Sequence, residues 1–185
     1  GGTAVNHAAT RDTLLPRLLR SYAAYYDVEP MEAQEPLVAT AFFHVHGTKY
    51  VLSKKAELWA TDNNEYVYFF SVPHLTEEVF DQCIQLAYER GMEHIHPDKN
   101  DMSSYIVALF LCDTYTEEAM RRLKRCRIRK SFQFSLKGWM EVHAAMIGVG
   151  MEPVVAGNSD GRKTVEFLKS LLFPEKVKKR KFKWK

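Results

Sequence analysis

Apolar and polar side chains alternate most clearly between Leu37 and Val72, and this alternation predicts a three-strand antiparallel meander. The three segments read LVATAFFHVH, KYVLSKKAELWA and EYVYFFSV. Gly47 and Thr48 separate the first two segments, and a glycine at the first position of a two-residue loop is typical of a type II′ hairpin turn. This turn predicts that His46 pairs with Lys49, Phe43 with Leu52, Ala41 with Lys54, Ala39 with Ala56 and Leu37 with Leu58.

The predicted register gives the first two strands two unlike faces, because neighbouring side chains point to opposite sides of a sheet. The apolar face, on which Lys54 is the one charge, holds Leu37, Ala39, Ala41, Phe43, Val45, Tyr50, Leu52, Ala56 and Leu58. The opposite face, called the mixed face below, holds Val38, Thr40, Phe42, His44, His46, Lys49, Val51, Ser53, Lys55 and Glu57.

The third segment is apolar on both faces. One side carries Tyr66, Tyr68, Phe70 and Val72, and the other carries Val67 and Phe69. Such a strand is typical of a sheet with helices on both sides. We therefore expect three layers, in which the mixed face lies at least partly under a helix or in a cleft.

Four helices and further strands are predicted around the meander. The helices run from Asp12 or Thr13 to about Tyr26 with Pro16 in the first turn, from Thr76 to Gly91, from Thr116 onward, and from Lys163 to Leu172. The strands cover Ser104 to Asp113 (parallel to the third meander strand), Phe132 to Leu136, Trp139 to Ile147, and a short edge strand at Val154 and Val155. Residues 27–36 are expected to form a connection. The order α-βββ-α-β-α-ββ(β)-α predicts a single α+β domain with a mixed β-sheet.

Length and composition favour one domain, which we place at residues 12–173 of the 185. Residues 1–11, which begin with two glycines, are expected to be disordered or left over from processing or cloning. Cys83, Cys112 and Cys126 have no paired spacing, which favours a reducing compartment over a disulfide framework. The longest apolar run, from Tyr105 to Cys112, is too short to cross a membrane. We expect a cytoplasmic protein of bacterial type.

Basic residues are concentrated in two segments. Seven of the 26 lysines and arginines lie in the last ten residues, and the rest of the chain has 19 basic against 23 acidic residues. Seven more form a second cluster: Arg121, Arg122, Lys124, Arg125, Arg127, Arg129 and Lys130. This cluster and a basic tail at residues 174–185, on an acidic body, indicate contact with nucleic acid or another polyanion. The alternatives are a solvated helix face for the cluster, and an anionic membrane surface or a solubilising end for the tail.

Two features of the mixed face would suit a metal ion. Lys55 and Glu57 would form a catalytic pair in which the carboxylate binds Mg²⁺. The alternative, a cross-strand ion pair, is favoured because no second carboxylate falls in register. His44 and His46 point the same way and would share Zn²⁺ or Ni²⁺, although the pattern supplies no third ligand and favours surface histidines. His94 and His96 repeat the same spacing.

Two resemblances extend this interpretation. Residues 14–147 resemble a small uncharacterised bacterial domain family through Tyr50-Val51-Leu52, Lys54-Lys55-Ala56, Asn64-Glu65-Tyr66-Val67, Phe69-Phe70-Ser71, and Arg129-Lys130 with Phe132, Phe134, Ser135, Leu136 and Gly138-Trp139-Met140. That resemblance implies no activity. The order α-βββ-α-β also resembles the restriction-endonuclease-like nucleases, which hold a metal with an acidic residue on the second strand and Glu-x-Lys on the third. Here Lys55-Ala56-Glu57 is reversed and lies on the second strand, and the third strand has no lysine.

Three functions follow from these observations. The leading one is a non-catalytic module that binds a polyanionic partner such as nucleic acid. The second is a metal-dependent nuclease-like enzyme, in which Glu57 and Lys55 converge with Glu29, Glu32 or Glu65. The third is a small-molecule binder whose pocket, between sheet and helix, is lined by Tyr66, Tyr68 and Phe70. The sequence leaves open whether the protein is an enzyme and what its oligomeric state is.

Overall fold

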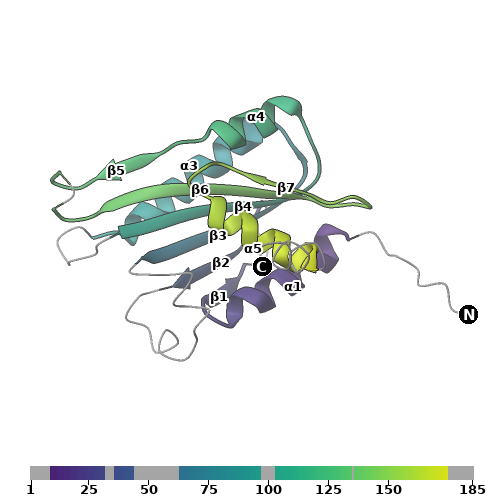
Figure 1. The fold of residues 1–185 in the computed structure, drawn as a ribbon, viewed down its shortest axis with the longest axis horizontal. Helices are drawn as coiled ribbons and strands as arrows, with labels where there is room; N and C mark the ends of the chain where they lie inside the picture. The colour runs from purple at the N-terminus through teal and green to yellow at the C-terminus, as the bar shows by residue number, and fades with distance from the viewer. Residues whose placement is uncertain (1–8, 32–35, 44–62, 97–102, 135, 175–185) are drawn as a thin grey trace, which may run out of the picture.

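A computed structural model describes residues 9–31, 36–43, 63–96, 103–134 and 136–174. Within them, seven strands form one sheet and four helices pack on it (Figure 1). The elements are α1 (Arg11–Ala23), β1 (Asp27–Pro30), β2 (Leu37–Phe43), β3 (Asn64–Leu75), α3 (Glu77–Glu93), β4 (Ser103–Tyr115), α4 (Glu117–Arg125), β5 (Arg129–Ser131), β6 (Trp139–Gly148), β7 (Val154–Gly157) and α5 (Arg162–Leu172). The predicted single α+β domain with a mixed sheet is confirmed.

The strands are ordered β1-β2-β3-β4-β6-β5, and β7 pairs with β6 beside β5. The centre is parallel, β3 with β4 and β4 with β6, whereas β1, β2, β5 and β7 pair antiparallel. The predicted parallel pairing of the 104–113 segment with the third meander strand is therefore confirmed. Near-continuous apolar runs in β3, β4 and β6 account for this central position, because parallel strands are buried on both faces.

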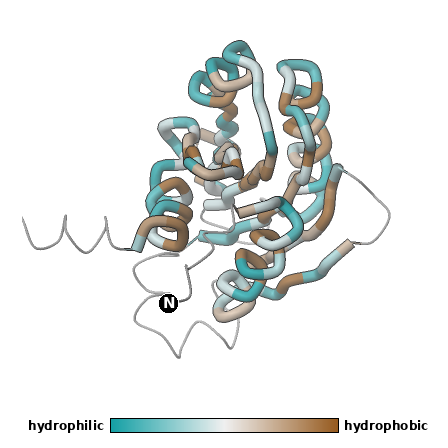
Figure 2. The backbone as a smooth tube through the Cα atoms, turned by 90° about the vertical axis from the view of Figure 1, so that its right-hand side faces the viewer, coloured by the Kyte–Doolittle hydropathy of each residue, from teal (hydrophilic) through white to brown (hydrophobic). Residues whose placement is uncertain are grey.

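Two hydrophobic cores lie on the two faces of the sheet. Tyr66, Tyr68 and Phe70 of β3 belong to the core under α3 and α4, and Val67 and Phe69 belong to the core under α1 and α5. This is the alternation expected for the third segment, and it confirms three layers. Figure 2 shows hydrophobic stretches running through the strands at the centre and hydrophilic residues predominating on the outer turns.

The predicted pairing of the first two meander segments is wrong where it can be compared, because both edges of β2 are occupied. Ala39 and Ala41 pair with β1 on one side and with β3 on the other, so Ala56 and Lys54 cannot be their partners. The segment expected to be a connection supplies β1, and its Pro30 is tolerated because β1 lies at the sheet edge. The Gly47-Thr48 turn and the Lys49 to Leu58 strand lie outside the described residues.

The predicted apolar face of the first strand is divided by an irregularity. The register with β3 shifts between Leu37 and Ala39. Leu37 consequently packs on the α3 side, whereas Ala39, Ala41 and Phe43 pack on the α1 side. A single irregularity of this kind reverses the facing of every residue beyond it.

Three further predictions are corrected. The predicted strand from Phe132 to Leu136 is wrong, because Gln133 and Phe134 have φ of 48° and 53° and turn the chain after β5. Pro16 lies inside α1, beyond the first turn, since Thr10 is the N-cap and the helix begins at Arg11. Gly91 does not end α3, which continues to Glu93. The caps at Thr76 and Thr116 are confirmed: each hydroxyl accepts a hydrogen bond from the backbone N–H three residues on.

Asn158, between β7 and α5, joins three parts of the chain. Its buried amide group donates to the carbonyls of Cys126 and Val142 at 3.0 and 2.9 Å, and accepts from the N–H groups of Ala144 and Gly161 at 3.0 and 2.8 Å. Every hydrogen-bonding site needed for a buried primary amide is thus used. This side chain fixes the end of α4, the middle of β6 and the start of α5 relative to one another.

A carboxyl group is buried in the core under α1. Glu65 of β3 accepts a hydrogen bond of 2.5 Å from the hydroxyl of Tyr26, which lies between α1 and β1. Desolvation raises the pKa of Glu65, and the Tyr26 hydrogen bond, then His143 and Lys163, oppose that rise. Glu65 shares a row of the sheet with Tyr105 of β4 and Glu141 of β6. His143 lies 3.0 Å from Glu141, and its ring centroid is 4.3 Å from that of Tyr105. The core therefore holds an ionisable group whose charge is disfavoured.

Gly91 provides a test of the packing between α3 and β4. A Cβ atom at Gly91 would lie 2.5 Å from the Cδ1 atom of Ile106, which is fully buried. Alanine normally stabilises a helix interior by roughly 1 kcal/mol over glycine, but here overpacking reverses the sign. We expect Gly91→Ala to lower the free energy of unfolding by about 1–3 kcal/mol in denaturant titrations. The loss should shrink in an Ile106→Ala background; an equal loss in both backgrounds would contradict the contact.

Glu65 provides a test of the buried carboxyl. Its folded pKa is raised above the unfolded value, so its stabilising contribution is complete below the ordinary carboxyl pKa and is lost as the pH rises through the raised one. Glutamine does not ionise and still accepts from Tyr26. Urea denaturation from about pH 5 to about pH 8 should show Glu65→Gln gaining stability relative to the unsubstituted chain as the pH increases. The control is Glu78→Gln, an exposed position, whose stability should change with pH as that of the unsubstituted chain does. The same parallel change for Glu65→Gln would show that the core tolerates the charge and would contradict the prediction.

Candidate functional site

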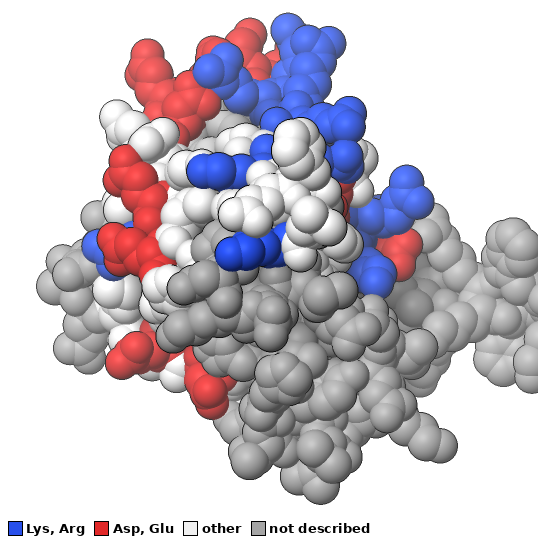
Figure 3. Space-filling model, turned by 90° about the vertical axis from the view of Figure 1, so that its left-hand side faces the viewer, with Lys and Arg blue, Asp and Glu red and all other residues white. Residues whose placement is uncertain are grey.

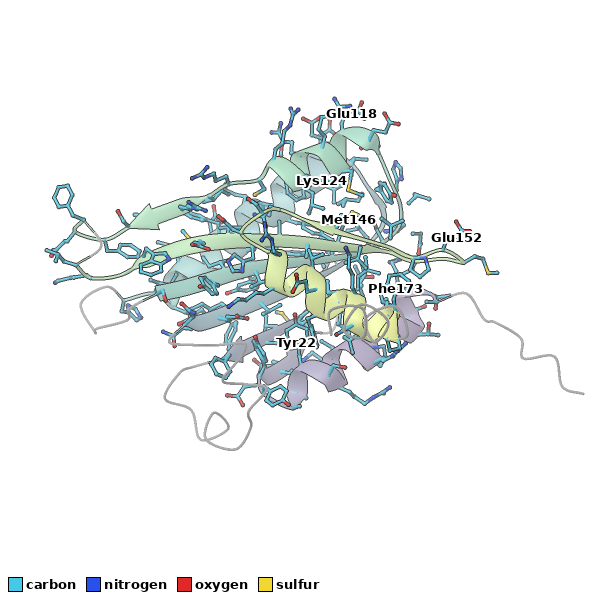
Figure 4. All side chains as sticks on the ribbon, in the orientation of Figure 1. Tyr22, Glu118, Lys124, Met146, Glu152 and Phe173 are labelled. Carbon is cyan, nitrogen blue, oxygen red and sulfur yellow. The ribbon has the colours of Figure 1, made fainter. Side chains whose placement is uncertain are left out.

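Five basic side chains form an exposed surface on α4 and the segment that follows it. The buried residues of α4 are Ala119 and Leu123, so the cations of the helix point to solvent. Figure 3 shows Lys and Arg gathered over α4 at the top, and Figure 4 labels Lys124 there. None of the five has an ion pair among the described residues. We call this set the basic surface: Arg121, Lys124, Arg125, Arg127 and Lys130.

The other two arginines of the predicted cluster are held by carboxylates. Arg122 forms a bidentate ion pair with Asp81 (Nε to Oδ1 2.9 Å, Nη2 to Oδ2 2.8 Å) and donates a third hydrogen bond to Glu77. These contacts join α4 to α3. Arg129 of β5 pairs in the same way with Asp160 before α5. That hydrogen bond lowers the pKa of Asp160. Arg122 and Arg129 therefore bind within the protein, and the cluster presents five cations rather than seven.

The turn between β5 and β6 is an exposed apolar tip. Phe134 is 97% exposed, Leu136 86% and Trp139 40%. Lys130 of the basic surface lies on the adjoining strand, with its Nζ atom 5.8 Å from the Phe132 ring centroid. Figure 1 shows β5 running from the end of α4 to this tip. We call Phe134, Leu136 and Trp139 the hairpin tip. Large apolar side chains exposed together mark an interaction site.

A groove of about 460 Å³ lies between α3 and α4. Its apolar lining includes Phe80, Ile84 and Ile128, and its polar lining mixes carboxylates with arginines. Cys126 also faces this groove, and burial raises the pKa of its thiol to about 11. Burial likewise raises the pKa values of Cys83 and Cys112 to about 12. At neutral pH these three thiols are therefore protonated.

A second and larger pocket, of about 750 Å³, opens on the α3 side of β1 and β2. Thr40 and Phe42 of the mixed face line it, so the described part of that face opens into a cleft, as expected. The remaining lining residues are Glu29, Pro30, Met31, Tyr68, Arg90, Glu93 and His94. Tyr68 is the one residue of the predicted aromatic trio that lines it, since Phe70 is fully buried in the core. Tyr66 instead stacks on His94 at 5.2 Å between ring centroids.

The sequence did not predict that residues of α3 and of the end of β1 would line a pocket. The pattern places Arg90 and Glu93 on the ordinary polar side of a helix, and it predicts a connection at residues 29–31. They meet because the β1–β2 pairing and the end of α3 fall on the same part of the sheet. A site assembled from four separate segments is not visible in any local pattern.

The predicted metal candidates Lys55, Glu57, His44 and His46 lie outside the described residues. Of the carboxylates proposed to join them, Glu32 is also outside. Glu29 lines the pocket on the α3 side, whereas Glu65 is buried on the α1 side, so these two do not converge. Within the described ranges, no three His, Cys, Asp or Glu side chains are grouped so as to hold a metal ion.

Comparisons with known proteins identify the family but no characterised relative. No curated protein matches the chain, and no solved structure matches it. In the part that the structure describes, no helix has the length and apolar character needed to cross a membrane. Residues 10–170 match a family described as a domain of unknown function (DUF8052). This agrees with the expected uncharacterised domain family, and the match spans most of the chain. The chain therefore belongs to the DUF8052 family.

Proposed function

We propose that this domain binds single-stranded nucleic acid through the basic surface and the hairpin tip. The observation that carries the proposal is their adjacency. Five exposed cations that form no ion pair among the described residues, although Arg127 is within electrostatic reach of Asp160, lie on α4, the segment after it and β5. The strand β5 leads on to exposed Phe134, Leu136 and Trp139. Cations neutralise phosphates, and aromatic rings stack on bases. Sites for single strands combine these two features, whereas duplex recognition needs an element that enters a groove.

The ion pairs of Arg122 and Arg129 support this assignment by fixing the frame that carries the free cations. Arg122 anchors α4 to α3, and Arg129 anchors β5 to the segment before α5. The basic surface is therefore attached at both ends to the body of the domain. A pre-positioned set of cations loses less conformational entropy on binding than a flexible one.

The charge distribution favours a directed approach of the ligand. Outside the two basic segments the chain is acidic, with 12 basic against 23 acidic residues. Figure 3 shows acidic side chains mostly down the left side of this view, with some beside the basic ones at the top. A polyanion is repelled by the body and attracted to the basic surface, which orients the encounter.

Neutralising three cations of the basic surface tests the electrostatic part. We expect Arg121→Ala/Lys124→Ala/Arg125→Ala to weaken binding to a fluorescent single-stranded oligonucleotide in anisotropy titrations. The slope of log K against log salt should decrease in magnitude by about 2, since each phosphate contact contributes roughly 0.7 for single strands. The matched control removes the same charge from α1 and α5, with Arg20→Ala/Arg162→Ala/Lys169→Ala, and should keep the slope.

The full chain and a chain ending at residue 174 are titrated in parallel, because residues 175–185 are themselves basic. The proposal requires the shorter chain to bind and to respond to the α4 substitutions. Failure of both chains to bind DNA or RNA at low salt would refute it. Binding by the full chain alone would assign the interaction to the tail.

Removing the ring of Phe134 tests the stacking part. Phe134 is 97% exposed, so Phe134→Ala should leave the free energy of unfolding unchanged. Loss of one stacked base should weaken oligonucleotide binding roughly five- to one-hundred-fold, with the salt slope preserved. Met151→Ala, which removes another highly exposed apolar side chain, serves as the control. Unaltered affinity of Phe134→Ala would exclude the hairpin tip from the site.

A further inference from the structure

The pocket beside β1 and β2 contains a buried hydroxyl group that the protein leaves unpaired. Tyr68 is 1% exposed, and its hydroxyl has no hydrogen-bond partner in the described structure. The one other buried side-chain atom of this kind among the described residues, the Nε atom of Arg11, lies 3.1 Å from the Asp113 carboxylate. Buried polar groups are nearly always paired, so an unpaired one that lines a pocket is a candidate contact for a bound molecule.

The position of Tyr68 on the pocket wall follows from the sheet register. Tyr68 pairs with Thr40 of β2, and Thr40 pairs with Glu29 of β1, so these three residues form one row across the sheet. The row faces the α3 side, and all three residues line the pocket. The pairing of β3 with β4 holds the inner end of the row in place.

Two opposite charges on α3 lie within electrostatic reach of the Tyr68 hydroxyl. Burial raises the pKa of Tyr68 well above its usual value, Arg90 opposes the rise and Glu93 adds to it. The hydroxyl is therefore a hydrogen-bond donor at neutral pH. Arg90 and Glu93 form no ion pair with each other among the described contacts, so a guanidinium and a carboxylate both remain available to a bound molecule.

The polar groups define the chemistry of the ligand. A hydroxyl donor beside a guanidinium selects a carboxylate, which accepts from both. Glu29 and Glu93, also in the lining, select a positively charged ammonium group and disfavour a phosphate dianion. Met31, Pro30 and Phe42 supply the apolar contact for a hydrocarbon or aromatic body. A volume of about 750 Å³ lies in the range of pockets that enclose small organic ligands.

We propose that this pocket binds a small zwitterion that joins a carboxylate and an ammonium group to an apolar body, as in a free amino acid with an aromatic or aliphatic side chain. The carboxylate contacts Tyr68 and Arg90, the ammonium group contacts Glu29 or Glu93, and the body packs on Met31 and Phe42. The proposal is independent of nucleic-acid binding, because none of the pocket residues belongs to the basic surface or to the hairpin tip.

The test titrates the full chain with three matched probes: phenylalanine, its amide, which lacks the carboxylate, and 3-phenylpropionate, which lacks the ammonium group. Binding is followed by isothermal titration calorimetry and by backbone amide chemical shifts. We expect phenylalanine to bind and to shift the backbone amide signals of Glu29, Met31, residues 40–42 and residues 90–94. Phenylalanine amide and 3-phenylpropionate should each bind at least tenfold more weakly than phenylalanine.

Two substitutions connect the binding to the named groups. Tyr68→Phe removes only the hydroxyl and should weaken phenylalanine binding about tenfold while leaving thermal stability equal or higher, because an unpaired buried group is lost. Arg90→Gln should weaken it at least as much. The controls are Tyr88→Phe on α3 and Arg121→Gln on α4, which do not line the pocket.

Three results would overturn the proposal. The first is no binding of phenylalanine at millimolar concentration. The second is binding that shifts signals elsewhere or that survives both Tyr68→Phe and Arg90→Gln. The third is binding of 3-phenylpropionate as tight as that of phenylalanine, which would show that Glu29 and Glu93 do not bind the ammonium group. Oligonucleotide binding measured on the same samples reports separately on the basic surface.

Discussion

The parallel register of β3, β4 and β6 is the constraint on which the rest of this structure depends. Because the three strands are hydrogen-bonded on both edges and buried on both faces, each residue in them is assigned to one core by its position alone. Tyr68 must face α3, and Glu65 must face α1. The pocket and the buried carboxyl are therefore consequences of the same register, seen from opposite sides of the sheet.

Much of this centre could be predicted from the sequence, because its signals are strong and local. The two-sided apolar pattern of residues 66–72 and the apolar run of residues 104–112 give the strands, the layers and the parallel pairing. The Thr76 and Thr116 caps give the starts of two helices. In each case a short segment contains the whole physical reason for its structure, and tertiary contacts reinforce it.

The predictions from sequence fail where a residue far away in the chain determines the local structure. The alternation at residues 132–136 is that of a strand, but two residues with positive φ make it a turn. The glycine at position 91 matches a helix end, but it is needed for close approach to Ile106. Likewise, a count of arginines cannot show that Arg122 is held by Asp81, 41 residues away, or Arg129 by Asp160, 31 residues away. The pocket draws on four separate segments, so no sequence window contains it.

Asn158 has a consequence for the order in which the domain can be completed. Its amide supplies the partners of the Val142 carbonyl and the Ala144 N–H in β6, and of the Cys126 carbonyl after α4. During synthesis the chain emerges from its N-terminus, so β6 leaves the ribosome with these groups open until residues 158–161 follow. The sheet can align its central strands earlier, but the side of β6 that carries β7 and α5 closes only after residues 158–161 have been synthesised. The Asn158 amide therefore completes the hydrogen bonding of this side of β6.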